Sequence, residues 1–315
     1  MKNNIIYLFI SLFLFAACGE EELTPSEPQE FYEFPQGDAE YDQEILAFYE
    51  EYGTQFLYEF RESDFRWNVT DYIPYYAEQG DTAYVSEAFH FVTEECFSIW
   101  EDDFLRQLLP VHVLLASEVY LPTEEYEYTW SDENQSWGYE WVYDTLICPT
   151  AYGLNHVTFG YTNEQITGLT SEEKLDLIGD MAKSLIAYAA SRDKIEIPED
   201  FSELFTTDWN TEDLATYTGD YGYNASGFLE YFEDIDVNYD FGLYVKYLVT
   251  MSEEDFKAWA LDESFDCNGE WSNSANAYVR SELILQKYEA VIDYFQNTLG
   301  IDLHSIGNQV STLYQ

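Results

Sequence analysis

TSEEKLDLIGDMAKSLIAY, residues 170–188, carries the clearest helix pattern in the chain. Thr170 belongs to the residue types that cap helix amino termini, and Glu172 and Glu173 follow where acids favour the helix dipole. Apolar residues then recur at helical spacing: Leu175, Ile178, Met181, Leu185, Ile186 and Tyr188. The stretch therefore predicts a long amphipathic helix at the centre of the fold.

Segments on either side add further helices and short buried strands. Apolar spacing predicts helices over 42–52, 82–109, 239–261 and 275–298, with Pro110 ending the second and Gly300 the last. Residues 111–115 and 154–161 have the pattern of buried strands. Between those two strands, residues 126–143 indicate an irregular or hairpin insertion. Together these elements predict a helix-rich α+β domain.

Composition limits what this domain can bind. The chain has 315 residues, with 62 Asp and Glu against 12 Lys and Arg, for a formal net charge of −50. A surface of this charge repels phosphate, which excludes nucleic acid as a partner. Hydrophobic residues make up 46% of the chain and aromatic residues 19%, which favours a folded core over disorder.

The first residues have the features of a bacterial lipoprotein signal. Lys2 precedes an apolar run, and small residues lead into Cys18, as in a lipobox. We therefore predict a signal peptide over 1–17, a lipidated Cys18 at the start of an acidic, proline-containing spacer over 18–37, and one domain over 38–315. An uncleaved anchor with an incidental cysteine is the alternative.

The acids after Cys18 indicate where the protein is displayed. Gly19-Glu20-Glu21-Glu22 resembles the acidic signal of surface-exposed lipoproteins of Bacteroidetes, although a solvated tether would look the same. We expect an outer-membrane lipoprotein whose domain faces the cell exterior.

Several separated motifs resemble one family. They are Tyr52 to Phe60, Phe104-Leu105-Arg106 with Leu109-Pro110, Ile197 to Phe201, Gly227-Phe228, Ile284 to Glu289, Tyr294-Phe295 and Gly300 to Leu303. Their order and spacing resemble the Bacteroidetes lipoproteins known as zinc-binding metallopeptidases or substrate-import-associated zinc metallohydrolases. The resemblance implies a zincin-like single domain and a place beside TonB-dependent nutrient importers of the starch-utilisation type.

The resemblance also implies a zinc motif that this chain lacks. Active members carry HExxH on the helix before the Pro-x-x-Phe element, where two His chelate zinc and the Glu activates water. Here Lys183 and Ala187 stand at the histidine places and Ser184 at the glutamate, while Tyr239 replaces the leading acid downstream. We therefore expect a degenerate member with neither zinc nor catalytic residues.

Other metal sites and cysteine pairings have weak support. His90 and Glu94 lie one helical turn apart and could form half a site, yet a structural role is favoured. His112 and His156 fall in strand-like runs, where we expect His156 to be a core or edge histidine with its hydrogen bonds satisfied. His304 falls in the tail after the last helix. The run Asp234 to Asp240 is calcium-like but lacks the Gly of an EF-hand, so a solvated acidic helix start is favoured.

Three cysteines remain: Cys96, Cys148 and Cys267. Three buried thiols are favoured over one disulfide and one thiol.

Aromatic residues alternate with acids between positions 126 and 143. Trp130, Trp137 and Trp141 are candidate ligand-binding residues, because flat rings beside carboxylates suit peptides or glycans. The same alternation would arise from one face of a strand pair, and both readings stay open.

The sequence thus predicts a surface lipoprotein that has lost its zinc site and acts as a binding or accessory component of an importer. Two alternatives remain. One is an active metallohydrolase or peptidase with unrecognised ligands, and the other is a structural importer subunit.

Overall fold

A mixed sheet organises the amino-terminal half of the fold. The structure, a computed structural model, describes residues 32–68, 73–131, 135–205, 227–230, 236–261 and 274–314, and the account below concerns the unit formed by residues 35–315. Strand β3 (His112–Ser131) pairs in parallel with β1 (Gln55–Leu57) and with β6 (His156–Phe159). Strand β5 (Thr150–Tyr152) is antiparallel to β6 and lies at the edge of this order.

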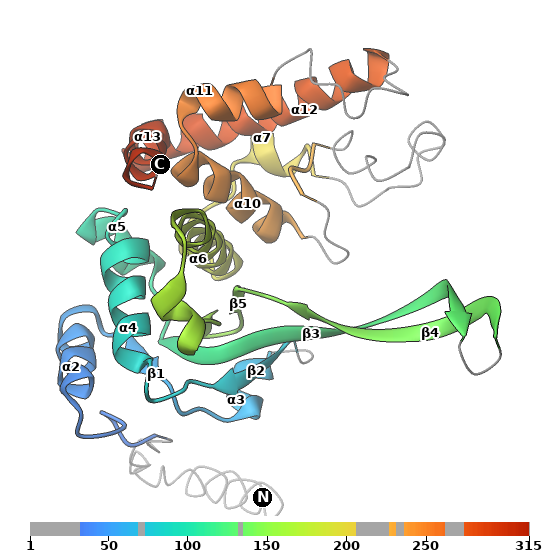
Figure 1. The fold of residues 1–315 in the computed structure, drawn as a ribbon. Coiled ribbons are helices and arrows are strands. Elements are labelled where there is room, and N and C mark those ends of the chain that lie inside the picture. Colours follow the sequence, from blue (N-terminus) through green and yellow to red (C-terminus); the bar gives the residue numbers. More distant parts are fainter. Residues whose placement is uncertain are drawn as a thin grey trace, which may run out of the picture. The chain divides into compact units, whose positions relative to one another are not determined.

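Strand β3 continues far beyond the sheet. Its later residues pair antiparallel with β2 (Tyr76–Gln79) and with β4 (Ser136–Ile147), which returns along it as a long hairpin (Figure 1). The strand predicted over 111–115 is therefore only the buried start of β3. Alternating acids and aromatics extend it as a two-stranded ribbon, which confirms the hairpin interpretation of residues 126–143.

Helix α6 (Ser171–Ser191) is the predicted central helix, and its prediction is confirmed. Thr170 caps it, because the Thr170 hydroxyl accepts from the Glu173 amide at 3.2 Å while the Glu173 carboxylate accepts from the Thr170 amide at 2.7 Å. The helix packs against β5 and β6, and its apolar residues from Leu177 to Ala190 are buried.

A second helical layer lies on the other side of α6. Helix α10 (Val237–Thr250) packs along α6, and α13 (Leu303–Leu313) and α12 (Ser274–Asp293) contact α10 in turn (Figure 1). The approach is closest at Gly242, where an added Cβ would lie 2.6 Å from the Lys183 carbonyl oxygen and 3.3 Å from the Ala187 Cβ. Only glycine lets the two helices meet at this distance.

Three predicted helices are divided in the structure. Residues 82–109 form α4 (Val85–His90), the π-helical η1 (Phe91–Phe97) and, after a break, α5 (Asp102–Leu108). Residues 239–261 form α10, α11 (Glu253–Phe256) and the π-helical η3 (Lys257–Leu261), because Ser252 caps a new helix start. Residues 275–298 form α12 and the π-helical η4 (Tyr294–Leu299), and Gly300, with φ of 74°, ends it as predicted.

The remaining elements complete the layers. Helix α2 (Glu40–Tyr52) confirms the first predicted helix and packs on β1, and the short α3 (Glu62–Arg66) packs on β2. The 3₁₀ segment η2 (Glu164–Gly168) precedes α6, and α7 (Glu199–Ser202) packs on α12. Among the described residues, no helix has the length and hydropathy needed to cross a bilayer. The helix-rich α+β prediction is confirmed by this mixed sheet and its helices.

Candidate functional site

A cleft opens between the edge of the sheet and the two central helices. It measures about 420 Å³ and is lined by the segment before β2, by β5, by α6 with its carboxyl end, and by the start of α10. Its polar and aromatic lining residues include Tyr75, Tyr152, Tyr239, Lys183, Ser184 and Arg192. The structure thus brings together three of the four positions that the sequence aligned with a zinc motif. Ala187 is the fourth, and it instead lies against Gly242 in the contact between the helices.

Lys183 is held in this cleft as a cation. Its Nζ donates to Asp180 Oδ1 at 2.8 Å and, more weakly, to the Tyr239 hydroxyl at 3.4 Å. Burial alone would lower the pKa of Lys183, but the Asp180 carboxylate beside it raises that pKa above its ordinary value. The ammonium form therefore persists at every physiological pH.

Asp180 holds two lysines at once. Lys246 Nζ on α10 lies 3.0 Å from the same Oδ1 atom that receives Lys183. Burial acts to raise the pKa of Asp180, yet the two ammonium groups outweigh it and hold that pKa below the usual range. The carboxylate is thus ionised and joins α6 to α10 beneath the cleft.

Ser184 also has a structural role. The Ser184 hydroxyl lies 2.7 Å from Thr150 Oγ1, and the Thr150 hydroxyl donates to the Asp180 carbonyl oxygen at 3.0 Å. The pair joins the edge strand β5 to α6. A serine in this position therefore fixes the wall of the cleft.

This set of groups does not fit zinc. Zinc in proteins is bound by thiolates, neutral imidazoles or carboxylates. The cleft instead presents an ammonium, hydroxyls, a guanidinium and one carboxylate, that of Asp236, which caps α10, and an ammonium repels a dication. In the parts of the chain that the structure describes, no three His, Cys, Asp or Glu side chains lie together in a way that could hold a metal ion.

The histidines fall on four separate elements. His90 Nε2 lies 2.9 Å from Glu44 Oε2 on α2, so its side chain contacts an acid of α2 rather than Glu94. His304 lies on α13, not in a tail, and its Nε2 is 2.8 Å from the Tyr288 hydroxyl. The tail prediction is wrong because Asp302 caps a further helix that the sequence reading missed.

His112 and His156 lie side by side on β3 and β6. His156 is 1% exposed and its two ring nitrogens have no hydrogen-bond partner, so the expectation of a satisfied core histidine is wrong. An added Cβ on Gly153 would lie 2.2 Å from His156 Cε1, so the imidazole fills the space that this glycine leaves.

The calcium-like run is used for helix capping and for a buried ion pair. Asp234 lies outside the described residues, and Asp236 caps α10 by accepting from the Tyr239 amide at 2.7 Å. Asp240 is fully buried against Lys287, so the expectation of a wholly solvated helix start is wrong at this residue.

Among the described cysteines, Cys96 and Cys148 are buried free thiols, as favoured, while Cys267 and the lipidation site Cys18 lie outside the described residues.

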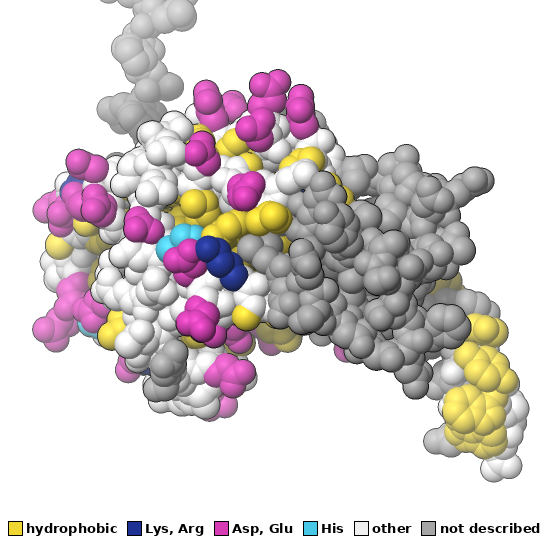
Figure 2. Space-filling view, turned by 90° about the horizontal axis from the view of Figure 1, so that it is seen from above, with side chains coloured by type: hydrophobic (Ala, Val, Ile, Leu, Met, Phe, Trp, Pro, Cys, Tyr) yellow, Lys and Arg dark blue, Asp and Glu magenta, His cyan; other side chains and the backbone are white. Residues whose placement is uncertain are grey.

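The three candidate tryptophans share one face of the hairpin. Trp130 is opposite Trp137 and Tyr128 is opposite Tyr139 in the register, and Trp141 and Tyr143 follow on the same face. These six side chains are between 45% and 70% exposed. Figure 2 shows a continuous hydrophobic surface at the end of the hairpin. We call this face, made of Tyr128, Trp130, Trp137, Tyr139, Trp141 and Tyr143, the aromatic face.

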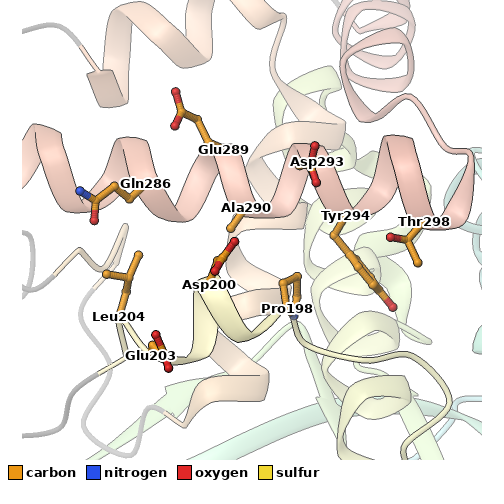
Figure 3. Close-up of a pocket in the computed structure, with 10 residues that line it drawn as sticks. All are labelled: Pro198, Asp200, Glu203, Leu204, Gln286, Glu289, Ala290, Asp293, Tyr294 and Thr298. Carbon is orange, nitrogen blue, oxygen red and sulfur yellow. The ribbon is translucent and has the colours of Figure 1, made fainter.

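A second depression is acidic. It measures about 680 Å³ and lies between α7 and α12, and Asp200, Glu203, Glu289 and Asp293 are among the residues that line it (Figure 3). These four side chains are exposed, so the depression is part of the charged surface of the chain.

Sequence reasoning missed Asp180, Lys246 and Arg192. Asp180 lies three residues before Lys183, a spacing at which helix side chains pair, so this contact had a local signal. Lys246 and Arg192 had none, because the pairing of Lys246 with Asp180 and the place of Arg192 in the cleft depend on how α10 and β5 pack on α6.

The comparisons with known proteins are sparse. No family model and no curated protein matches the chain. Among solved structures it is similar to one from Bacteroides caccae described as a "putative zinc-binding metallo-peptidase", at 13% identity over 88% of this chain and 94% of that chain, with a TM-score of 0.49. A likeness of this degree assigns the chain to no family. The resemblance and the zincin-like part of the fold prediction therefore remain predictions.

Proposed function

We propose that the protein is a non-catalytic binding lipoprotein of the outer membrane. It is anchored through Cys18, faces the cell exterior and works as an accessory component of a TonB-dependent nutrient importer. One observation carries the non-catalytic part of the proposal. Lys183, at a place where the resemblance implies a zinc-binding histidine, is an ammonium ion paired with Asp180 at 2.8 Å.

The chemistry of the cleft supports this role. A hydrolase of the implied kind needs a metal-bound water and a base to activate it. The cleft supplies cations and phenols in place of ligands and base. Of the two nearby carboxylates, Asp236 caps α10 and Asp180 is paired with two lysines. Such a set can recognise a polar ligand through hydrogen bonds and charge. The cleft is therefore suited to binding.

Metal content and hydrolysis test the non-catalytic role. Protein extracted from membranes in mild detergent should contain far less than one zinc per chain by mass spectrometry, with or without added zinc. It should not cleave peptides in a way that a chelator inhibits. Stoichiometric zinc that a chelator removes together with hydrolysis would favour the active metallohydrolase instead, and Lys183→Ala would then show whether the cleft takes part.

Association with an importer is tested separately. The proposed accessory role predicts that the protein co-purifies with an outer-membrane importer and that the isolated protein still binds ligand. Co-purification without any ligand binding by the isolated protein would favour a purely structural subunit.

The aromatic face is proposed as a second contact surface for the ligand polymer, a peptide or a glycan. Tyr128 and Trp137 stack with ring centroids 5.8 Å apart, and Trp130 meets Trp137 edge to face at 6.0 Å. Exposed rings arranged in this way offer flat surfaces to the apolar faces of sugars or peptides.

Replacing one of these rings tests the surface. Trp137→Ala should weaken binding of neutral oligosaccharides or peptides about tenfold, which corresponds to ~1.4 kcal/mol. Trp67→Ala is the matched control, because Trp67 is 52% exposed directly after α3 and is not part of the aromatic face. Affinity electrophoresis and titration calorimetry provide the measurement. Equal losses in both variants, or none in either, would contradict the assignment.

A further inference from the structure

In a chain this acidic, nearly every described basic side chain has a carboxylate partner. Eight of them lie within 3.6 Å of a carboxylate oxygen: Arg61, Arg66, Arg106, Lys174, Lys183, Lys246, Lys257 and Lys287. Two of the basic side chains that the structure describes have no carboxylate oxygen within this distance. One is Lys194, which donates to the Leu109 carbonyl oxygen, and the other is Arg192. Arg192 is therefore an exception that needs a reason.

Arg192 lies where a ligand could reach it. It follows the last residue of α6 and lines the cleft together with Tyr152, Tyr239 and Lys183. Its Nε is buried and has no hydrogen-bond partner. The buried Nε has no acceptor within the chain, which sets Arg192 apart from the paired cations, and the residue lines the cleft, where a ligand would meet its guanidinium.

The helix dipole gives only part of the explanation. A cation at the carboxyl end of α6 interacts favourably with the dipole, which accounts for a positive charge at this position. The dipole does not account for a buried Nε with no acceptor. A guanidinium presents parallel N–H donors that match the two oxygens of a carboxylate, a geometry that an ammonium cannot reproduce.

The local charge permits an anion despite the net charge of the chain. Beneath the cleft, Lys183 and Lys246 are balanced by the carboxylates of Asp180 and Glu230, so these four groups together carry no net charge. Asp236 also lines the cleft, but its carboxylate accepts from the Tyr239 amide at the start of α10. At physiological ionic strength charges are screened over about 8 Å, so these near groups dominate over the distant acids.

We propose that Arg192 anchors the carboxylate of a small polar ligand in the cleft. The volume of about 420 Å³ suits a compound the size of an acidic sugar or a dipeptide, and the phenols of Tyr152 and Tyr239 line the space beside it. This inference rests on the proposed binding role of the cleft, and it adds the chemical class of the ligand.

Matched ligand pairs test the proposal on the full-length protein in detergent. Titration calorimetry would compare D-glucuronate with D-glucose, and the dipeptide Ala-Tyr with its carboxyl-terminal amide. In at least one pair the carboxylate should bind at least tenfold more tightly than its neutral partner. The pair that responds identifies the source of the carboxylate. If no carboxylate binds up to 10 mM (roughly the weak limit of a specific site), or the neutral partners bind equally well, the proposal is overturned.

Arginine variants locate the contact. Arg192→Gln should abolish the preference for the carboxylate, and Arg192→Lys should keep part of it, because the charge remains without the paired donors. Arg61→Gln is the control, since Arg61 is exposed and paired with Asp64 outside the cleft. An unchanged preference in Arg192→Gln would overturn the assignment.

The two proposals fail in distinguishable ways. If the unaltered protein contains no zinc, does not hydrolyse peptides and does not bind carboxylates, this inference alone is overturned. Zinc-dependent hydrolysis would overturn the non-catalytic role instead. The ligand pairs on the unaltered protein decide the inference even if a variant does not fold.

Discussion

Replacing Lys287 by methionine should destabilise the protein by about 3–5 kcal/mol, because it leaves a buried carboxylate without its counter-charge. Lys287 Nζ lies 2.7 Å from Asp240 Oδ2, and both side chains are 0% exposed. The ammonium also donates to the Gly227 carbonyl oxygen at 3.2 Å and lies 4.2 Å from the centre of the Phe228 ring. The free energy of unfolding, measured with urea, tests this expectation.

Two controls separate the buried charge from the loss of a lysine. Lys287→Met combined with Asp240→Leu should recover most of the lost stability, since replacing both partners of a buried pair by apolar residues is often neutral or stabilising. Lys257→Met should cost less than about 1 kcal/mol, because its pair with Glu253 is nearly half exposed. If Lys287→Met costs no more than Lys257→Met, the account of the buried pair is wrong.

Acid should destabilise the protein through His156. Burial, with a smaller contribution from the neighbouring His112, lowers the pKa of His156 to about 3, while the ordinary histidine value is 6.5. Above pH 6.5 the imidazole is neutral in both the folded and the unfolded chain, so its contribution is constant. Below pH 6.5 only the unfolded chain takes up the proton. Between pH 7.5 and pH 5 this uptake should cost about 2 kcal/mol of folding free energy.

A difference between variants isolates this histidine from the other titrating groups. Asp64 and His112 face His156, and burial raises the pKa of Asp240 to about 6, so Asp240 also titrates in this range. These groups are unchanged in His156→Leu, whose stability should fall about 2 kcal/mol less than that of the wild type between pH 7.5 and pH 5.

The control for this measurement lies on the same strand. Thr158→Val is buried on β6 and removes no titratable group, so it should keep the wild-type pH dependence. Urea unfolding at the two pH values provides the comparison. Identical pH dependence in His156→Leu and in the wild type would contradict the assignment.

Local patterns in the sequence predicted the parts of the fold that local chemistry determines. The capping box at Thr170 and the left-handed Gly300 mark helix ends by side-chain or backbone preference, and both lie as predicted. The helix break that follows Phe97 is not marked by a proline or a glycine in the sequence. Helix α13 did have a signal, a capping Asp302 before spaced apolar residues, and it was overlooked.

The long-range pairs could not be predicted, for a reason of composition. Asp180 with Lys246, and Asp240 with Lys287, join residues that are distant in sequence. With 62 acids in the chain, any lysine has many candidate partners, and only the packing of the helices selects one. The aligned positions Lys183, Ser184 and Tyr239 were recognisable from sequence, whereas their shared cleft and its unpaired Arg192 required the packing of α6, α10 and β5.

The contact at Gly242 has a consequence for evolution. A side chain there would meet the backbone carbonyl of Lys183, so drift at this position would force α6 and α10 apart. The side chains of Lys183 and Tyr239 point into the cleft, where their chemistry can change without moving either helix. One glycine would therefore hold the shape of the cleft while substitutions at the residues that line it change the ligand that it accepts.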